Sequence, residues 1–161
     1  MEQPVLLNSV LHHFRYLMDE HGFALVNEKN DYDTPFGSRI VILQSPECRV
    51  RFVRDRGQVL VAAASLTQPE DWFDLAVVNA YLLRENRVQW EYPTPDHSLD
   101  PAARIDKQIA RLADILSPHW VQIIDLFRQE NFAREIKDLE AFIVIWNTQI
   151  LKDRGGINPF G

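Results

Sequence analysis

Apolar and polar residues alternate most clearly about one third of the way along the chain, in a segment that predicts a β-hairpin. Val50 and Phe52 fall on one face of its first strand and Arg49 and Arg51 on the other, which is the period of two of a half-buried sheet. Gly57 follows and supplies the positive φ that a tight hairpin turn needs. The rest of the chain is therefore expected to pack against the valine–phenylalanine face or to border an outward arginine face.

Further apolar segments on both sides of this hairpin predict an antiparallel meander. Strands are expected at 23–27 and 38–44, and the second arm of the hairpin is apolar from Val59 to Ala64. The alternating segment 88–92 could add a fifth strand before the prolines that follow it.

Helical spacing of apolar residues marks the remaining segments. The expected helices are 4–20, 68–83, 101–116 and a stretch from 118 to 153 that forms either one helix or two. Thr67 and Glu70 form a capping-box pattern, and Asp100 precedes a proline at a favourable first-turn position. Gly22 is the natural end of the first helix, and Asn131 either caps a last helix or lies inside it.

The strands gather early and the helices late, which favours an α+β fold over alternating βαβ units. We expect a four- to five-stranded antiparallel meander sheet with helices on one face and a C-terminal helical subdomain. Residues 1–98 would form the sheet region, and residues 99–161 the helical subdomain packed on it. A chain of 161 residues suits one compact domain.

Charge and composition narrow the class of protein. The net charge is −6, from 23 acidic and 17 basic residues, which argues against a nucleic-acid partner. The single cysteine permits no internal disulfide, and the N-terminus lacks the features of a signal peptide. The longest apolar run, 141–146, is far shorter than a membrane span. We therefore expect a cytoplasmic protein without a membrane partner.

No pattern of catalytic or metal-binding residues emerges from the sequence. The five histidines have no metal-site spacing, and neither a glycine-rich phosphate loop nor a nucleophile motif is present. Asp31 and Asp33 read as turn formers rather than cation ligands, and Cys48 as a small strand residue beside Glu47. His97, beside Asp96, is the least disfavoured candidate for an acid–base group. No cofactor and no metal are expected, and an enzyme is disfavoured.

Two groups of residues are candidates for binding a partner. Arginines crowd the hairpin: Arg49, Arg51, Arg54 and Arg56. They form either a docking face for carboxylates, which Arg39 could join, or a solvated sheet face. Trp90 and Tyr92 are of the types that anchor interfaces, although they could equally cover the sheet.

The run 141–146 is apolar around the whole helix. Such a helix is buried on most sides, either by its own domain or by a second subunit. A homodimer contact through the C-terminal helix is therefore one expectation for the partner.

Three pieces of sequence resemble a loose set of uncharacterised small bacterial proteins across residues 10 to 83. They are Gly22-Phe23, the segment 53–59 (Val-Arg-Asp-Arg-Gly-Gln-Val), and Trp72-Phe73-Asp74-Leu75. Some small acidic α+β proteins of this style are immunity proteins that neutralise toxins. The resemblance implies no catalytic residues.

Three hypotheses follow for the function. The first is a non-enzymatic protein-binding module, immunity- or antitoxin-like or an accessory subunit, in which arginines pair with acids on a partner while Trp90 or Tyr92 fills a pocket. The second is a small-molecule sensor or enzyme with a pocket between sheet and helices, which would bring His97, Trp90 and Arg51 around one polar ligand. The third is a structural homodimer subunit.

Overall fold

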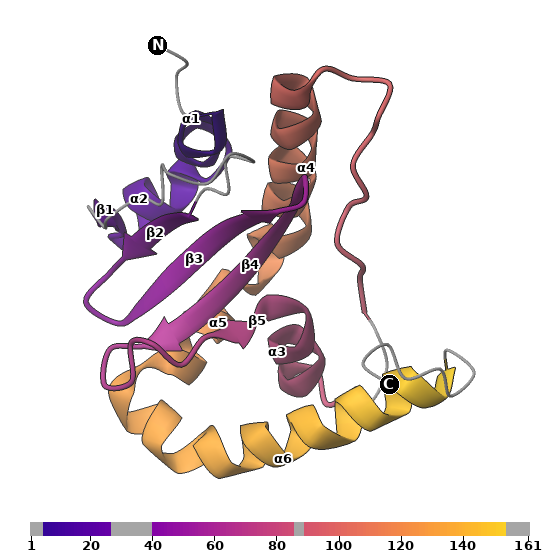
Figure 1. Cartoon of the computed structure of the whole chain (residues 1–161). Coiled ribbons are helices and arrows are strands. Elements are labelled where there is room, and N and C mark those ends of the chain that lie inside the picture. Colours follow the sequence, from indigo (N-terminus) through magenta and orange to yellow (C-terminus); the bar gives the residue numbers. More distant parts are fainter. Residues whose placement is uncertain (1–4, 27–39, 86–88, 154–161) are drawn as a thin grey trace.

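The computed structural model describes residues 5–26, 40–85 and 89–153, and it is an α+β fold (Figure 1). The helices are α1 (Val5–His13), α2 (Arg15–His21), α3 (Leu75–Leu82), α4 (Pro101–Leu116), α5 (Trp120–Phe127) and α6 (Gln129–Asp153), with a 3-10 turn at Ser117–His119. The strands are β1 (Ala24–Val26), β2 (Ile40–Gln44), β3 (Cys48–Asp55), β4 (Gln58–Ser65) and β5 (Phe73–Asp74). The predicted loop 28–37, Arg39 and the end of the chain after 153 lie outside the described residues.

The five strands form one antiparallel meander in the order β1-β2-β3-β4-β5, as expected. The identity of the fifth strand differs from the prediction. Phe73–Asp74 pairs with β4, whereas Gln89 to Tyr92 is not a strand, and Val88 lies outside the described residues. Side chains, rather than a further strand, satisfy the edge of β4 where that segment passes, as described below.

The β3–β4 hairpin confirms the predicted turn. Asp55 pairs with Gln58, and Arg56 and Gly57 both adopt positive φ, at 53° and 83°. Two successive residues of this kind form the turn whose twist matches that of the strands. Val50 and Phe52 are fully buried, so the predicted core face of the hairpin is correct.

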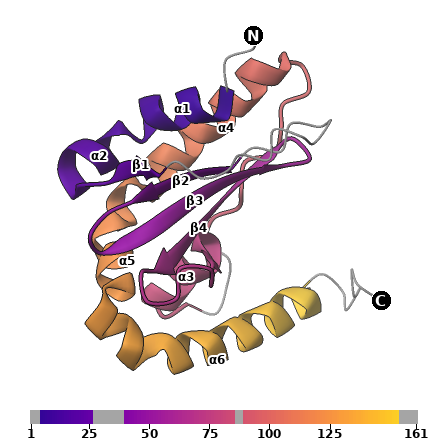
Figure 2. The same ribbon diagram turned by 60° about the vertical axis from the view of Figure 1, so that its left-hand side comes forward.

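Helices α1, α2 and α4 cover the core face of the sheet, and α3 and α6 lie on its other side (Figures 1 and 2). Phe14 connects the layers, because its ring lies 4.7 Å from that of Phe52 and 6.2 Å from that of Trp120. Buried side chains from 1–98 and from 99–161 belong to one core cluster. None of the helices within the described ranges is long and apolar enough to cross a bilayer.

The first predicted helix is broken in two at Phe14. Its φ of −103° and ψ of 21° leave the helical region, and its fully buried ring enters the core. The predicted end at Gly22 is correct: φ is +73°, and the next amide, of Phe23, donates to the carbonyl of Leu17 at 3.1 Å.

The predicted capping box at Thr67 and Glu70 is wrong. Thr67 Oγ1 contacts Ser65 Oγ at 2.8 Å, residues 66–72 form a loop, and α3 begins only at Leu75. Pairing of Phe73–Asp74 with β4 holds the chain extended at this point, so a tertiary contact overrides the local start signal.

The later helices agree more closely with the sequence. Asp100 caps α4 by accepting from the Ala103 amide at 2.9 Å. The stretch from 118 to 153 is divided between α5 and α6, because the ψ of Arg128 is 135°. Asn131 is inside the first turn of α6 and donates to the carbonyl of Asp125 at 2.7 Å.

Candidate functional site

The site is built along the free edge of β4, which β5 covers over only two residues. Ala62 pairs with Asp74, after which the chain turns into α3. The backbone of Val61 therefore needs another partner on this side. The hydroxyl of Tyr92 provides it: it accepts from the Val61 amide at 3.3 Å and donates to the Val61 carbonyl at 2.8 Å.

Gln108 of α4 satisfies the same edge nearer to the hairpin. Its Oε1 accepts from the Val59 amide at 3.0 Å and its Nε2 donates to the Gly57 carbonyl at 2.8 Å. Side chains thus replace the strand that was predicted around Trp90 and Tyr92. We call residues 89–100, which precede α4, the connecting segment. It runs beside the sheet without entering it.

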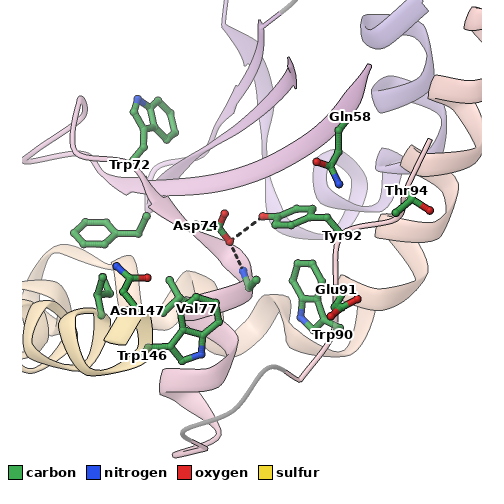
Figure 3. A pocket seen from close by; sticks show the side chains of 13 residues that line it. Gln58, Trp72, Asp74, Val77, Trp90, Glu91, Tyr92, Thr94, Trp146 and Asn147 are labelled. Atoms are coloured by element: carbon green, nitrogen blue, oxygen red, sulfur yellow. Dashed lines mark hydrogen bonds between the residues drawn. The ribbon is translucent and has the colours of Figure 1, made fainter. Parts of the chain in front are cut away.

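Asp74 lies where this edge meets the start of α3. Its Oδ1 accepts from the Ala76 amide at 2.8 Å and lies 3.0 Å from the Tyr92 hydroxyl, whose single proton it shares with the Val61 carbonyl (Figure 3). Burial raises the pKa of the Asp74 carboxyl above its ordinary value, although these hydrogen bonds act in the opposite direction. Burial, and then the charge of Asp74, raise the pKa of Tyr92 well above its usual range, so the proton stays on the tyrosine.

A hollow of about 660 Å³ opens beside Asp74, between the sheet, α3, the connecting segment and α6. This volume is within the range of ligand-binding pockets. Figure 3 shows side chains from these elements around it. Its lining residues are Gln58, Trp72, Phe73, Asp74, Ala76, Val77, Trp90, Glu91, Tyr92, Thr94, Ile143, Trp146 and Asn147. We call it the aromatic hollow.

The aromatic hollow combines π surfaces with negative charge. Three of the four tryptophans of the chain line it: Trp72 from the β4–β5 loop, Trp90 from the connecting segment and Trp146 from α6. Asp74 and Glu91 add two carboxylates, and none of the lining residues is Lys, Arg or His. The electrostatics of this site favour a cationic or neutral ligand over an anionic one.

Two indole N–H groups at this site have no hydrogen-bond acceptor among the described residues. They are the Nε1 atoms of Trp90 and Trp146, both buried. Tryptophan can only donate, and a buried donor without an acceptor is unusual in a folded protein. Because both atoms are enclosed by the protein, they do not themselves indicate what the hollow binds.

A smaller hollow, of about 300 Å³, adjoins the first. It lies on the face of the sheet opposite to the buried Val50 and Phe52. The strand register places Arg51, Ala62 and Asp74 in one row across β3, β4 and β5. Because alanine is small, the middle of this row is open. Trp72 and Asp74 line both hollows, so the two adjoin at these residues.

The predicted outward arginine face is wrong for Arg49. This residue is only 6% exposed, and its Nη1 donates to the Pro69 carbonyl at 2.9 Å. The guanidinium carbons of Arg49 and Arg51 lie 5.3 and 4.6 Å from the centroid of the Trp72 ring. The β4–β5 loop, rather than a helix, therefore covers this face, and Arg51 stays half-buried at the smaller hollow.

Arg54 and Arg56 diverge from the other two arginines. By alternation Arg54 shares the face of Val50 and Phe52, near the end of β3, although it borders the smaller hollow. Arg56 occupies the exposed hairpin turn and lines none of the hollows described above. The four arginines thus do not form one patch.

The second hypothesis expected three residues around a single ligand, but the structure distributes them. Trp90 lines the aromatic hollow, Arg51 the smaller one, and His97 a third hollow of about 710 Å³ between the connecting segment and α4. Within the part of the chain that the structure describes, no group of three His, Cys, Asp or Glu residues could hold a metal ion. Burial raises the pKa of the Cys48 thiol to about 12, which leaves it a poor nucleophile.

Sequence reasoning also missed a serine–histidine–aspartate cluster between α1 and α4. Ser9 Oγ and His13 Nε2 both contact Asp106 Oδ1, at 2.9 and 3.0 Å. In a catalytic triad the histidine lies between serine and aspartate, so this arrangement cannot activate the hydroxyl. Burial would raise the pKa of Asp106, but the two contacts lower it below its ordinary value, as in a structural clamp.

Of the predicted partner-binding residues, Trp90 and Tyr92 line the aromatic hollow, and Arg51 and Arg54 line the smaller one. Trp72, Asp74 and Trp146 were missed as site residues. The sequence signal for Asp74 existed, since aspartate before an apolar helical run is a good N-cap. The stronger capping-box pattern upstream obscured it.

Comparison with known proteins gave no match to a protein-family model, to a curated protein or to a solved structure. The resemblance to small bacterial α+β proteins therefore stays a prediction. Function has to be argued from the site itself.

Proposed function

We propose that this chain is a non-enzymatic protein-binding module that takes a segment of a partner protein into the groove formed by the two adjoining hollows. The module would act by occlusion, in the manner of an immunity or antitoxin protein or of an accessory subunit in the cytoplasm. The observation that supports the proposal is that the two hollows adjoin, because Trp72 and Asp74 line both of them. Two adjoining hollows suit a chain segment better than a compact molecule.

The composition of the groove supports the same function. Tryptophan and tyrosine are the residue types that most often dominate binding energy at protein interfaces. No arrangement of nucleophile, base and orienting group occurs around the described part of the groove, which favours binding over catalysis.

Affinity capture with paired variants tests the proposal. Glu91 is exposed at the hollow, whereas Glu140 is exposed on α6 and does not line it. Glu91→Lys should remove a protein that the wild type captures from the native cell lysate, and Glu140→Lys should retain it. Equal capture by both variants would exclude the groove as the contact.

A small ligand is the second candidate, because the volume of the aromatic hollow by itself suits a small molecule. Native mass spectrometry of protein purified from its own cells distinguishes the two. A bound small molecule would favour the sensor hypothesis.

The homodimer remains a third candidate because of the exposed side of α6. Val144 and Ile145 are 66% and 57% exposed, whereas Phe142 and Ile143 pack against the core, so the described part of the chain leaves one side of this apolar run open. A second copy could cover it. Light scattering at micromolar concentration would detect the dimer, and Val144→Lys should then dissociate it.

A further inference from the structure

The residues that line the aromatic hollow also indicate which kind of side chain it binds. Its thirteen lining residues include five aromatic side chains and the carboxylates of Asp74 and Glu91, without a positively charged residue. Aromatic faces and carboxylates attract organic cations together, because both present negative potential to the ligand. A carboxylate ligand would instead meet two like charges.

We propose that the aromatic hollow binds the alkylammonium group of a lysine side chain that a partner protein carries on the docked segment. This inference rests on the proposed function, because the segment supplies the residues that flank the lysine. It names the class of side chain that the site selects.

The state of Asp74 supports a cationic ligand. Its Oδ1 contacts the Ala76 amide and the Tyr92 hydroxyl, and the residue is exposed beside the hollow. No Lys, Arg or His lines the hollow to balance the charge of this carboxylate. An ammonium group there would supply the opposite charge.

The tryptophans differ in their availability to a cation. Trp72 already lies beside the guanidinium groups of Arg49 and Arg51. A further cation on that ring would be repelled by two positive charges. The ammonium group is therefore expected near Trp90 and Trp146, next to the exposed carboxylate of Glu91.

The adjoining hollow favours a lysine on a polypeptide over a free amine. It is lined by Val53 and Leu60 in addition to Trp72, and residues that flank the lysine can pack there.

The test uses short blocked peptides that have a central lysine between alanine and glycine residues. The control peptide is identical except that the lysine carries an Nε-acetyl group, which removes the charge. Amide chemical shifts report the binding: Ala76 marks the cap of α3 beside the hollow, and Ala103 marks the equivalent cap of α4. Blocked lysine alone is a third probe.

The lysine peptide should shift the Ala76 amide in a saturable manner and leave Ala103 unchanged. The acetyl-lysine peptide should bind several-fold more weakly. Replacing both Trp90 and Trp146 by leucine should weaken the lysine peptide by about threefold to thirtyfold. Glu91→Gln should weaken it by about twofold to fivefold, with Glu140→Gln as the neutral control.

The outcomes separate this inference from the proposed function. Equal binding of the lysine and acetyl-lysine peptides at Ala76 would overturn the cation preference while leaving a peptide groove intact. Binding of lysine alone as tightly as the peptide would retain the cation site but contradict the docked segment. No shift at Ala76 with any probe at millimolar concentration would overturn the inference.

Discussion

At the scale of single residues, Tyr92 and Asp74 connect the edge of β4 to the start of α3 beside the hollow. Tyr92 closes the free edge of β4 with its hydroxyl, and Asp74 joins that hydroxyl to the start of α3. Both were placed by tertiary contacts with β4. The sequence identified Tyr92 as an anchor, but its role at the sheet edge depends on where β5 ends.

Tyr92→Phe should destabilise the protein by about 1–3 kcal/mol, because it leaves the N–H and C=O of Val61 unsatisfied. Tyr81→Phe is the matched control. It removes the hydrogen bond that the Tyr81 hydroxyl donates to Glu135, but this carboxylate is partly exposed and can bind water instead. Urea unfolding measures both variants. Equal losses of stability would show that the hydroxyl of Tyr92 does not close the edge.

Asp74→Asn should make the pH dependence of stability flatter. A raised folded-state pKa means that Asp74 favours the fold below its unfolded pKa, about 3.9, and that this contribution is lost as pH rises through the folded value. Asparagine can still accept from the Ala76 amide but does not ionise.

The difference in unfolding free energy between the Asp74→Asn variant and the wild type should therefore grow in favour of the variant from pH 4 to pH 7. Urea unfolding at several pH values measures this difference. Because the two proteins share all other titratable groups, the contributions of those groups cancel. A constant difference across this range would mean that the pKa of Asp74 is not raised by folding.

At the scale of elements, sequence patterns predicted correctly those elements whose structure depends only on residues near one another in the chain. The β3–β4 hairpin depends on alternation and on Gly57, both of which are readable from sequence. The start of α3 and the choice of fifth strand depend on pairing between Asp74 and Ala62, which no local signal contains. The same holds for Arg49, whose alternation predicts an exposed side chain but whose burial comes from a loop twenty residues away.

Arg49 should therefore act as an anchor of the β4–β5 loop. Arg49→Leu removes the hydrogen bond to the Pro69 carbonyl and the contact with Trp72, so the loop should exchange its amide hydrogens faster, with a loss of about 1–3 kcal/mol. The Asp71 amide, which donates to Gln68, is a suitable reporter.

Arg15→Leu serves as the control for this substitution, because Arg15 is exposed on α2. Its effect on the Asp71 amide should be negligible. If Arg49→Leu leaves the exchange of Asp71 unchanged as well, Arg49 does not hold the loop over the sheet.

At the scale of the whole molecule, the sheet separates a structural side from a binding side. Helices α1, α2 and α4 build the core on one face, while α3 and α6 border the groove on the other (Figure 2). The α+β class and the meander were predictable from the order of apolar patterns. The groove was not, because its tryptophans come from three segments far apart in sequence.

Fluorine NMR of protein containing 5-fluorotryptophan tests the central claim most directly, because each of the four tryptophans gives one signal. Trp120 is in the core, where its Nε1 donates to the Tyr16 hydroxyl at 2.9 Å, so it is an internal control. On addition of the partner protein obtained by affinity capture, the signals of Trp72, Trp90 and Trp146 should move and that of Trp120 should not. A complex that leaves the three groove signals in place would contradict the account.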